Sequence, residues 1–193
     1  MKDVIALLYP GCIFFELALA SELLSKKYNI RYVTPDGSDH LANNGMVLKA
    51  YGAFKDVNMD NVAAILVPGG NFDSVKDDLD SDRLLQIAFD KKIWLAAICG
   101  GPFLLGKAGV LKDKKIAHGF NANQLLFLSP YFEGTTFTDD KWVSDQNILT
   151  ARPEAHIEFA VELAARLMAI NPVDVTRTKE YYRGGVSKIR PIS

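Results

Sequence analysis

Cys99 has the sequence surroundings of a reactive thiol. It follows an apolar run of strand length at residues 93–98 and precedes Gly100, Gly101 and Pro102. A nucleophile at such a strand-to-helix junction occupies a strained turn that needs small neighbours, and the free amides of the following helix favour the thiolate. The alternative is a small buried hydrophobe that ends a core strand. The glycines and the proline after Cys99 favour the reactive thiol.

Two glycine amides are candidates for an oxyanion hole. A Pro-Gly-Gly sequence ending in Gly70 follows the apolar run 62–67, and Gly100 follows Cys99 directly. Glycine lets a backbone N–H face a site with no side chain in the way. Gly70 and Gly100 could therefore hold a negative charge that develops beside the sulfur. For the Pro-Gly-Gly sequence alone, a simple turn is the alternative.

Glu16 is the candidate acid. It lies between Phe15 and Leu17 in a stretch with helical spacing of apolar residues. A carboxylate in apolar surroundings is costly unless it is protonated or hydrogen-bonded, so burial would raise its pKa. The alternative is an ordinary glutamate that faces solvent.

The three histidines are His40, His118 and His156. His118 follows a predicted strand that starts at Lys115, so a Cys–His pair with Cys99 is possible. His40 lies in a polar loop, and His156 is in the first turn of the last predicted helix, where a surface or capping role is as plausible. No group of His, Cys and Asp has metal-ligand spacing, so neither a metal nor another cofactor is expected.

Short apolar runs alternate with longer amphipathic stretches, which predicts βαβ units and a mostly parallel sheet covered on both faces. In such sheets the ligand site lies beyond the carboxyl ends of the strands, where Cys99 and Gly70 fall. The predicted strands are 3–9, 29–34, 46–50, 62–67, 93–98 and 115–120, with a hairpin of 142–143 and 148–151. The predicted helices are 12–26, 79–92 with Asp80 or Ser81 as its N-cap, a helix after Cys99, 123–127 and 154–168.

The composition is that of a soluble globular protein. The 193 residues are 49% apolar and 23% charged, with a net charge of −1. These figures predict one domain over 1–193, with a core at 1–170 and an unassigned extension at 171–193. They also argue against nucleic-acid binding. The chain has no run of membrane length and no signal-peptide pattern, so a cytoplasmic protein with two free thiols is expected, with no membrane partner.

Residues 97–102 (AICGGP) resemble the A-I-C-x-G-P nucleophile elbow of the ThiJ/PfpI (DJ-1/PfpI) superfamily. The sequence VPGG at 67–70 resembles the second signature of that superfamily, and residues 148–152 and 158–160 resemble the segment before its last helix. The resemblance covers about the whole chain. It implies a single-domain, three-layer α/β/α sandwich of the flavodoxin-like, class I glutamine amidotransferase-like type, and a homodimer.

The same resemblance assigns roles to the candidate residues. Glu16 lies six residues before Glu22, which takes the place of the acid in a P-x-E-V-L motif. It would be the protonated carboxyl that hydrogen-bonds the Cys99 sulfur. Gly70 and Gly100 would supply the oxyanion hole. Many members have a histidine at the end of a K-V-T-T-H stretch, but His118 comes one position early, and a strand residue displaced by one faces the other way.

These observations predict a cysteine-dependent hydrolase or lyase. Its substrate would be a small electrophile: a reactive carbonyl such as methylglyoxal, an amide or an isonitrile. Cys99 would attack, with Glu16 and His118 as its candidate partners in proton transfer. The first alternative is a redox-sensing or stress-response protein whose Cys99 is reversibly oxidised. The second is a ligand-binding domain of the kind that the superfamily fuses to transcription regulators, which ranks last.

Overall fold

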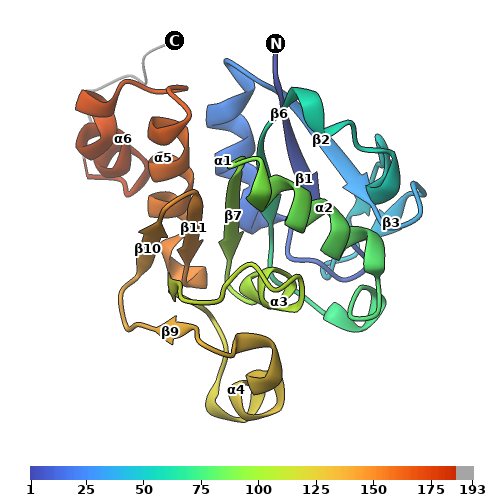
Figure 1. Ribbon diagram of the computed structural model, residues 1–193. Coiled ribbons are helices and arrows are strands. Elements are labelled where there is room, and N and C mark those ends of the chain that lie inside the picture. Colours follow the sequence, from blue (N-terminus) through green and yellow to red (C-terminus); the bar gives the residue numbers. More distant parts are fainter. Residues whose placement is uncertain (186–193) are drawn as a thin grey trace.

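The computed structural model describes residues 1–185 and contains a seven-stranded sheet with helices on both faces (Figure 1). The strand order is β10-β11-β7-β6-β1-β2-β5, and every neighbouring pair is parallel except β10 and β11. These strands are β1 (Asp3–Leu7), β2 (Asn29–Thr34), β5 (Gly52–Ala53), β6 (Val62–Val67), β7 (Trp94–Ile98), β10 (Trp142–Asp145) and β11 (Ile148–Ala151). The predicted α/β/α fold with a mostly parallel sheet is confirmed.

The remaining elements surround this sheet. Two short strand pairs lie outside it: β3 (His40–Leu41) with β4 (Val47–Leu48), and β8 (Lys115–Ile116) with β9 (Thr136–Phe137). The helices are α1 (Phe15–Ser25), α2 (Leu79–Asp90), α3 (Pro102–Lys107), α4 (Ala122–Leu128), α5 (His156–Arg166) and α6 (Val175–Tyr182). Helices α1 and α5 pack together on one face of the sheet, and α2 and α3 cover the other. Among residues 1–185, no helix has both the length and the apolarity needed to cross a bilayer.

The central strands are buried on both faces, which explains their continuous apolar sequences. In β1, β6 and β7 almost every side chain is buried. Parallel strands bring their carboxyl ends to one edge, so the residues after β1, β6 and β7 meet there. These residues include the loop before α1, the Pro-Gly-Gly sequence and Cys99.

Several predicted boundaries are wrong, for local reasons. Helix α1 starts at Phe15 and not at Cys12, because Cys12 forms an antiparallel bridge with Gly70. The N-cap of α2 is Asp78, not Asp80 or Ser81: its side chain accepts from the Ser81 amide at 2.6 Å. The strand predicted at 115–120 ends at Ile116, after which the chain turns toward Cys99. A 3₁₀ turn at 153–155 precedes α5, which begins at His156.

The segment after residue 170, to which the sequence analysis assigned no structure, includes a helix. Helix α6 packs against α5. Lys179 pairs with Glu162 at 2.5 Å, and Arg183 pairs with Glu158 at 2.5 Å. These ion pairs attach the segment that contains α6 to helix α5. The last part of the predicted extension, 186–193, lies outside the described residues.

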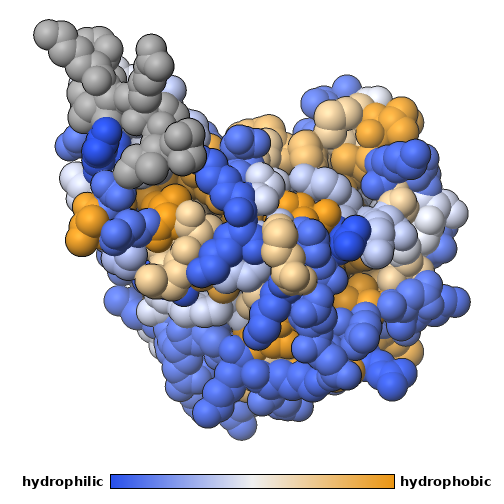
Figure 2. Space-filling model, turned by 90° about the horizontal axis from the view of Figure 1, so that it is seen from above, coloured by the Kyte–Doolittle hydropathy of each residue, from blue (hydrophilic) through white to orange (hydrophobic). Residues whose placement is uncertain are grey.

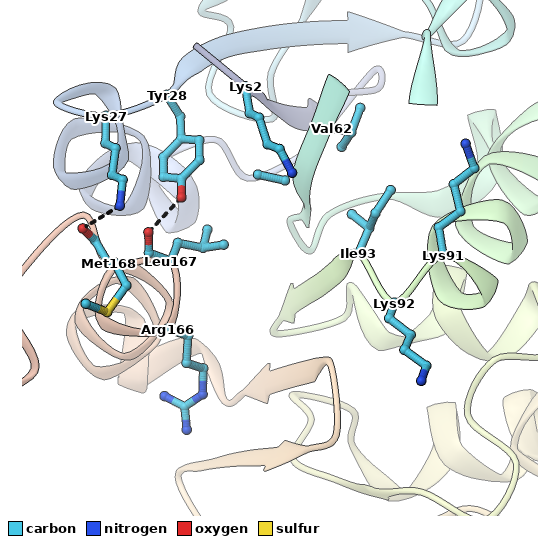
Figure 3. Close-up of a pocket in the computed structure, with 11 residues that line it drawn as sticks. Lys2, Lys27, Tyr28, Val62, Lys91, Lys92, Ile93, Arg166, Leu167 and Met168 are labelled. Carbon is cyan, nitrogen blue, oxygen red and sulfur yellow. Dashed lines mark hydrogen bonds between the residues drawn. The ribbon is translucent and has the colours of Figure 1, made fainter. Parts of the chain in front are cut away.

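A cavity of about 360 Å³ opens at the amino ends of the strands, opposite Cys99 (Figure 3). Lys27, Lys91 and Arg166 line it and lie at the carboxyl ends of α1, α2 and α5, where a positive charge offsets the negative end of a helix dipole. Lys27 and Tyr28 donate hydrogen bonds to the carbonyls of Met168 and Leu167, which join the ends of α1 and α5. Figure 2 looks onto this end of the molecule, which is mostly hydrophilic. The positive side chains of this cavity are therefore explained by their positions at the carboxyl ends of helices, which they stabilise.

Candidate active site

Cys99 occupies a left-handed backbone conformation at the end of β7. Its φ is 62°, a value that costs a non-glycine residue energy unless its surroundings hold it. The Cys99 amide donates to the Ala151 carbonyl at 2.9 Å, and its carbonyl accepts from the Gly119 amide at 2.6 Å. Pro102 then begins α3. The strand-to-helix turn expected of a nucleophile elbow is thus present and is held by hydrogen bonds on both sides.

Glycine is required at two positions near Cys99, because a side chain there would collide with neighbouring atoms. A Cβ on Gly101 would lie 2.4 Å from the Val67 carbonyl oxygen, and a Cβ on Gly69 would lie 2.9 Å from the Cys99 sulfur. Neither distance is tolerated by real side chains. The elbow and the end of β6 are therefore packed backbone against backbone, which explains why both segments carry glycine pairs.

Gly70 and Gly100, the two predicted oxyanion-hole residues, both line the cavity beside Cys99. Gly70 has a φ of 141° and pairs with Cys12 in the antiparallel bridge. The bridge consists of two hydrogen bonds. The Ile13 amide donates to the Gly69 carbonyl at 2.9 Å, and the Asn71 amide donates to the Gly11 carbonyl at 3.2 Å. The hydrogen bonds of residues 1–185 leave the Gly70 amide without a backbone acceptor. The Gly100 amide hydrogen-bonds the Cys99 side chain.

Tyr9 and Glu16 form hydrogen bonds with the Pro-Gly-Gly segment at the end of β6. The buried Tyr9 hydroxyl donates to the Pro68 carbonyl at 2.8 Å. Glu16, in the first turn of α1, is only 2% exposed. Its Oε2 accepts from the Gly69 amide at 2.7 Å, and its carboxyl group also hydrogen-bonds the Cys99 side chain. Glu16 thus connects α1, the end of β6 and the elbow.

Cys99 and Glu16 titrate as a pair. Burial, and then the charge and hydrogen bond of Glu16, raise the pKa of Cys99 to about 12, against the opposing bond from the Gly100 amide. Burial also raises the pKa of Glu16, although the bonds from Gly69 and Cys99 oppose the rise. Two acids that share a hydrogen bond lose their protons in two separated steps. Between those steps the pair holds one proton, on sulfur or on oxygen.

His118 is turned away from the sulfur. Its Nδ1 accepts from the Phe120 amide at 3.0 Å, its ring stacks on Phe120, and the edge of Phe137 contacts it. Burial, and then the charge of Arg152, lower the pKa of His118, so the neutral ring is favoured. Gly119, one residue later, is the residue that packs against Cys99: its Cβ would lie 3.0 Å from the Cys99 Cα.

The other two histidines also make contacts elsewhere. The His156 ring meets the edge of Phe15 at 5.9 Å between centroids, and His40 Nε2 lies 2.8 Å from Asp36. The structure therefore brings together Cys99, Glu16, Gly70 and Gly100. In the contacts of residues 1–185, none of the three histidines touches the Cys99 sulfur.

A cavity of about 330 Å³ opens beside Cys99. The reasoning from sequence missed several of its side chains, because they come from loops whose positions depend on the fold. Only Gln124 has a visible sequence signal, since Asn121 and Gln124 have the spacing of a capping box. Within the described chain, no cluster of three or more His, Cys, Asp or Glu side chains could hold a metal ion. The cavity is lined by Gly11, Ile13, Asn43, Gly70, Asn71, Phe72, Cys99, Gly100, Gly119, Phe120 and Gln124.

Comparison with known proteins agrees with this fold. The chain is 27% identical to the "Uncharacterized protease YoaZ" of Bacillus subtilis over 175 residues, covering 88% of this chain and 77% of that protein. It is 25% identical to the "Isonitrile hydratase" of Pseudomonas putida over 170 residues, covering 82% and 72%. The DJ-1 superfamily protein Atu0886 of Agrobacterium tumefaciens superposes with a TM-score of 0.83 at 23% identity, covering 96% and 100%.

A second solved structure, Drosophila melanogaster DJ-1beta, superposes with a TM-score of 0.78 at 22% identity, covering 94% of this chain and 97% of that one. At these identities the structural matches establish the fold. The sequence pattern of the DJ-1/PfpI family matches residues 4–166, nearly the whole chain. The chain therefore belongs to the DJ-1/PfpI family.

Proposed function

We propose that the protein is a cysteine-dependent hydrolase or lyase that acts on a small electrophile through Cys99. The observation that carries the proposal is the Cys99–Glu16 hydrogen bond at a strained elbow, beside an open cavity. A strained conformation persists only where the surroundings maintain it, and such strain concentrates at active sites. The family contains hydrolases and lyases, and the relatives named above as a protease and an isonitrile hydratase fit this class.

The residues of the site suffice for addition to an electrophilic carbon. The thiol proton of Cys99 passes to Glu16, the sulfur forms a bond to the carbon, and the π electrons of the carbonyl move to its oxygen. The amides of Gly70 and Gly100 then donate hydrogen bonds to that oxygen. Glu16 holds the proton for return in the following step. The Gly69 amide, which donates to Oε2, leaves Oε1 as the oxygen that carries this proton.

The test is turnover by the purified protein with methylglyoxal, a small aliphatic amide and an alkyl isonitrile as separate substrates. One of them is expected to be consumed, with activity lost in Cys99→Ala and retained in Cys12→Ala. Activity that survives in Cys99→Ala, or no turnover of any of the three, would contradict the proposal.

Redox sensing through Cys99 is the second candidate. The partly exposed sulfur lies against the Glu16 carboxyl and the Gly100 amide, two groups that can hydrogen-bond an oxygen added to it. Mass spectrometry after treatment with hydrogen peroxide would show one or two added oxygens on Cys99. Oxidation without turnover of the three substrates would favour this candidate over the enzyme.

A further inference from the structure

Two amide side chains of the cavity are held in one orientation by local hydrogen bonds. Asn71 Oδ1 accepts from the Asp73 amide at 3.0 Å. Gln124 Oε1 accepts from the Asn121 amide at 3.0 Å, as part of the capping box at the start of α4. A backbone N–H can only donate, so each side-chain oxygen must be the partner and neither amide can be reversed without losing its bond.

The side-chain NH₂ groups of Asn71 and Gln124 are therefore fixed as a pair of hydrogen-bond donors. Because their oxygens face these backbone amides, Asn71 and Gln124 turn the NH₂ groups Nδ2 and Nε2 the other way. Within residues 1–185 neither nitrogen has a hydrogen-bond partner. Both residues line the cavity that contains Cys99. The oxyanion-hole amides of Gly70 and Gly100 are also donors, so the polar wall of this cavity is rich in hydrogen-bond donors.

We infer that Asn71 and Gln124 form a substrate subsite that binds an oxygen acceptor carried by the electrophile in addition to its reacting carbon. This inference rests on the proposed function and narrows its substrate class. A carbonyl, amide or carboxylate oxygen satisfies the two NH₂ groups. Asn71 and Gln124 are exposed, so water keeps these NH₂ groups when a plain alkyl isonitrile binds, and such a substrate gains no contact there. An electrophile with the additional oxygen gains one or two hydrogen bonds and is preferred by that amount.

Two substitutions invert the donors and keep the local structure. Asn71→Asp retains an oxygen for the Asp73 amide, and Gln124→Glu retains one for the Asn121 amide. In each case an acceptor replaces the NH₂ group. Asn43 also lines the cavity, but no side-chain hydrogen bond orients it among the described residues. Asn43→Asp therefore adds the same negative charge without removing a committed donor, and it is the matched control.

The experiment measures alkylation of Cys99 with two probes of similar size. Iodoacetamide carries an oxygen acceptor, and iodoethane does not. Each rate is divided by the rate of free cysteine with the same reagent, and peptide mapping assigns the modified residue. The ratio of the two normalised rates cancels any change in the pKa of the thiol, because that change affects both probes equally.

The ratio is expected to favour iodoacetamide in the unsubstituted protein. It should fall about threefold in each variant and about tenfold in the double variant, as expected for the loss of one or two neutral hydrogen bonds. Asn43→Asp should leave it unchanged. An unchanged ratio in the double variant, or an equal fall in Asn43→Asp, overturns the subsite. Resistance of Cys99 to both probes would instead contradict the proposed function. If one single variant fails to fold, the rate ratio of the other single variant tests the subsite, and an unchanged ratio there overturns it.

Discussion

The Gly69 amide donates a hydrogen bond of 2.7 Å to Glu16 Oε2, and this contact joins α1 to the end of β6 directly beneath the Cys99 sulfur. Both groups are buried, so each would lose hydrogen-bonding energy without the other. The same carboxyl also bonds the Cys99 side chain. Glu16 therefore has a structural and a chemical role, and substitutions must be chosen to separate the two.

Glu16→Gln should change the pH dependence of Cys99 alkylation. In the unsubstituted protein the pair holds one proton between the ionisation of Glu16 and that of Cys99 at about 12. In that range the reactive thiolate is the form with the proton on Glu16, whose share of the pair does not change with pH, so the alkylation rate should depend only weakly on pH across the neutral range. The variant lacks the charge and the hydrogen bond that raise the thiol pKa, so that pKa should fall. The rate should then rise about tenfold per pH unit below the new pKa.

Iodoacetamide kinetics across that pH range, with peptide mapping, measure both profiles. Glu22→Gln is the matched control, because Glu22 is an exposed residue of the same helix. Its profile should follow that of the unsubstituted protein. Profiles of equal slope in Glu16→Gln and the unsubstituted protein would contradict a shared proton.

Gly101→Ala should destabilise the fold. Its Cβ would meet the Val67 carbonyl oxygen at 2.4 Å, so the elbow or the end of β6 must move. Overpacking of this kind costs about 1–3 kcal/mol. Urea denaturation followed by circular dichroism measures the loss. Gly52→Ala is the control, since nothing lies within 4 Å of its Cβ position, and its free energy of unfolding should stay within about 0.5 kcal/mol. Equal losses in both variants would be evidence against the tight elbow.

The amino-acid sequence was sufficient to predict the layers of the fold and the place of Cys99 within them. Buried parallel strands leave long apolar runs, and the two glycine pairs mark where the backbones meet. The start of α1 could not be predicted, because Cys12 is held outside the helix by its bridge to Gly70, a contact between distant residues. The turn of His118 away from the sulfur depends on the chain leaving β8 after Ile116. The cavity-lining loops are likewise set by tertiary contacts.

The attachment of α6 should weaken in acid. Burial by itself would raise the pKa of Glu162, but the hydrogen bonds from Lys179 and Arg166 outweigh burial, and the pKa is lowered. A carboxyl group with a lowered pKa in the folded state stabilises that state above its ordinary pKa, and the contribution is lost as pH falls through the folded-state value. The ordinary value is 4.5, so the loss should occur below about pH 4.5.

Lys179→Met tests this attachment. At pH 7 it should lower the free energy of unfolding by on the order of 1 kcal/mol, and the difference from the unsubstituted protein should shrink as the pH falls toward 3. Urea denaturation at both pH values measures it. Lys55→Met is the control, because Lys55 is an exposed residue of a different segment, with no ion pair among residues 1–185. A difference that is the same at pH 7 and pH 3 would assign the effect of Lys179 to packing on Trp142 rather than to charge.

Cys99 should be alkylated before Cys12. Both are free thiols, but Cys12 is fully buried whereas Cys99 lines an open cavity. Burial raises the pKa of Cys12 and also blocks access to its sulfur. Burial and Glu16 raise the pKa of Cys99 as well, but its sulfur faces the cavity, and the Glu16 carboxyl beside it can take its proton. Iodoacetamide at pH 7.5 should therefore modify Cys99 at least about tenfold faster, because the reagent reaches Cys99 from the cavity, whereas Cys12 reacts only after a local opening that costs more than about 1.4 kcal/mol. Peptide mapping in urea gives the reference in which the two thiols react alike. If mapping of the folded protein finds Cys12 modified first, Cys99 is not the nucleophile, because the strained turn would then hold a thiol less reactive than one enclosed by the core.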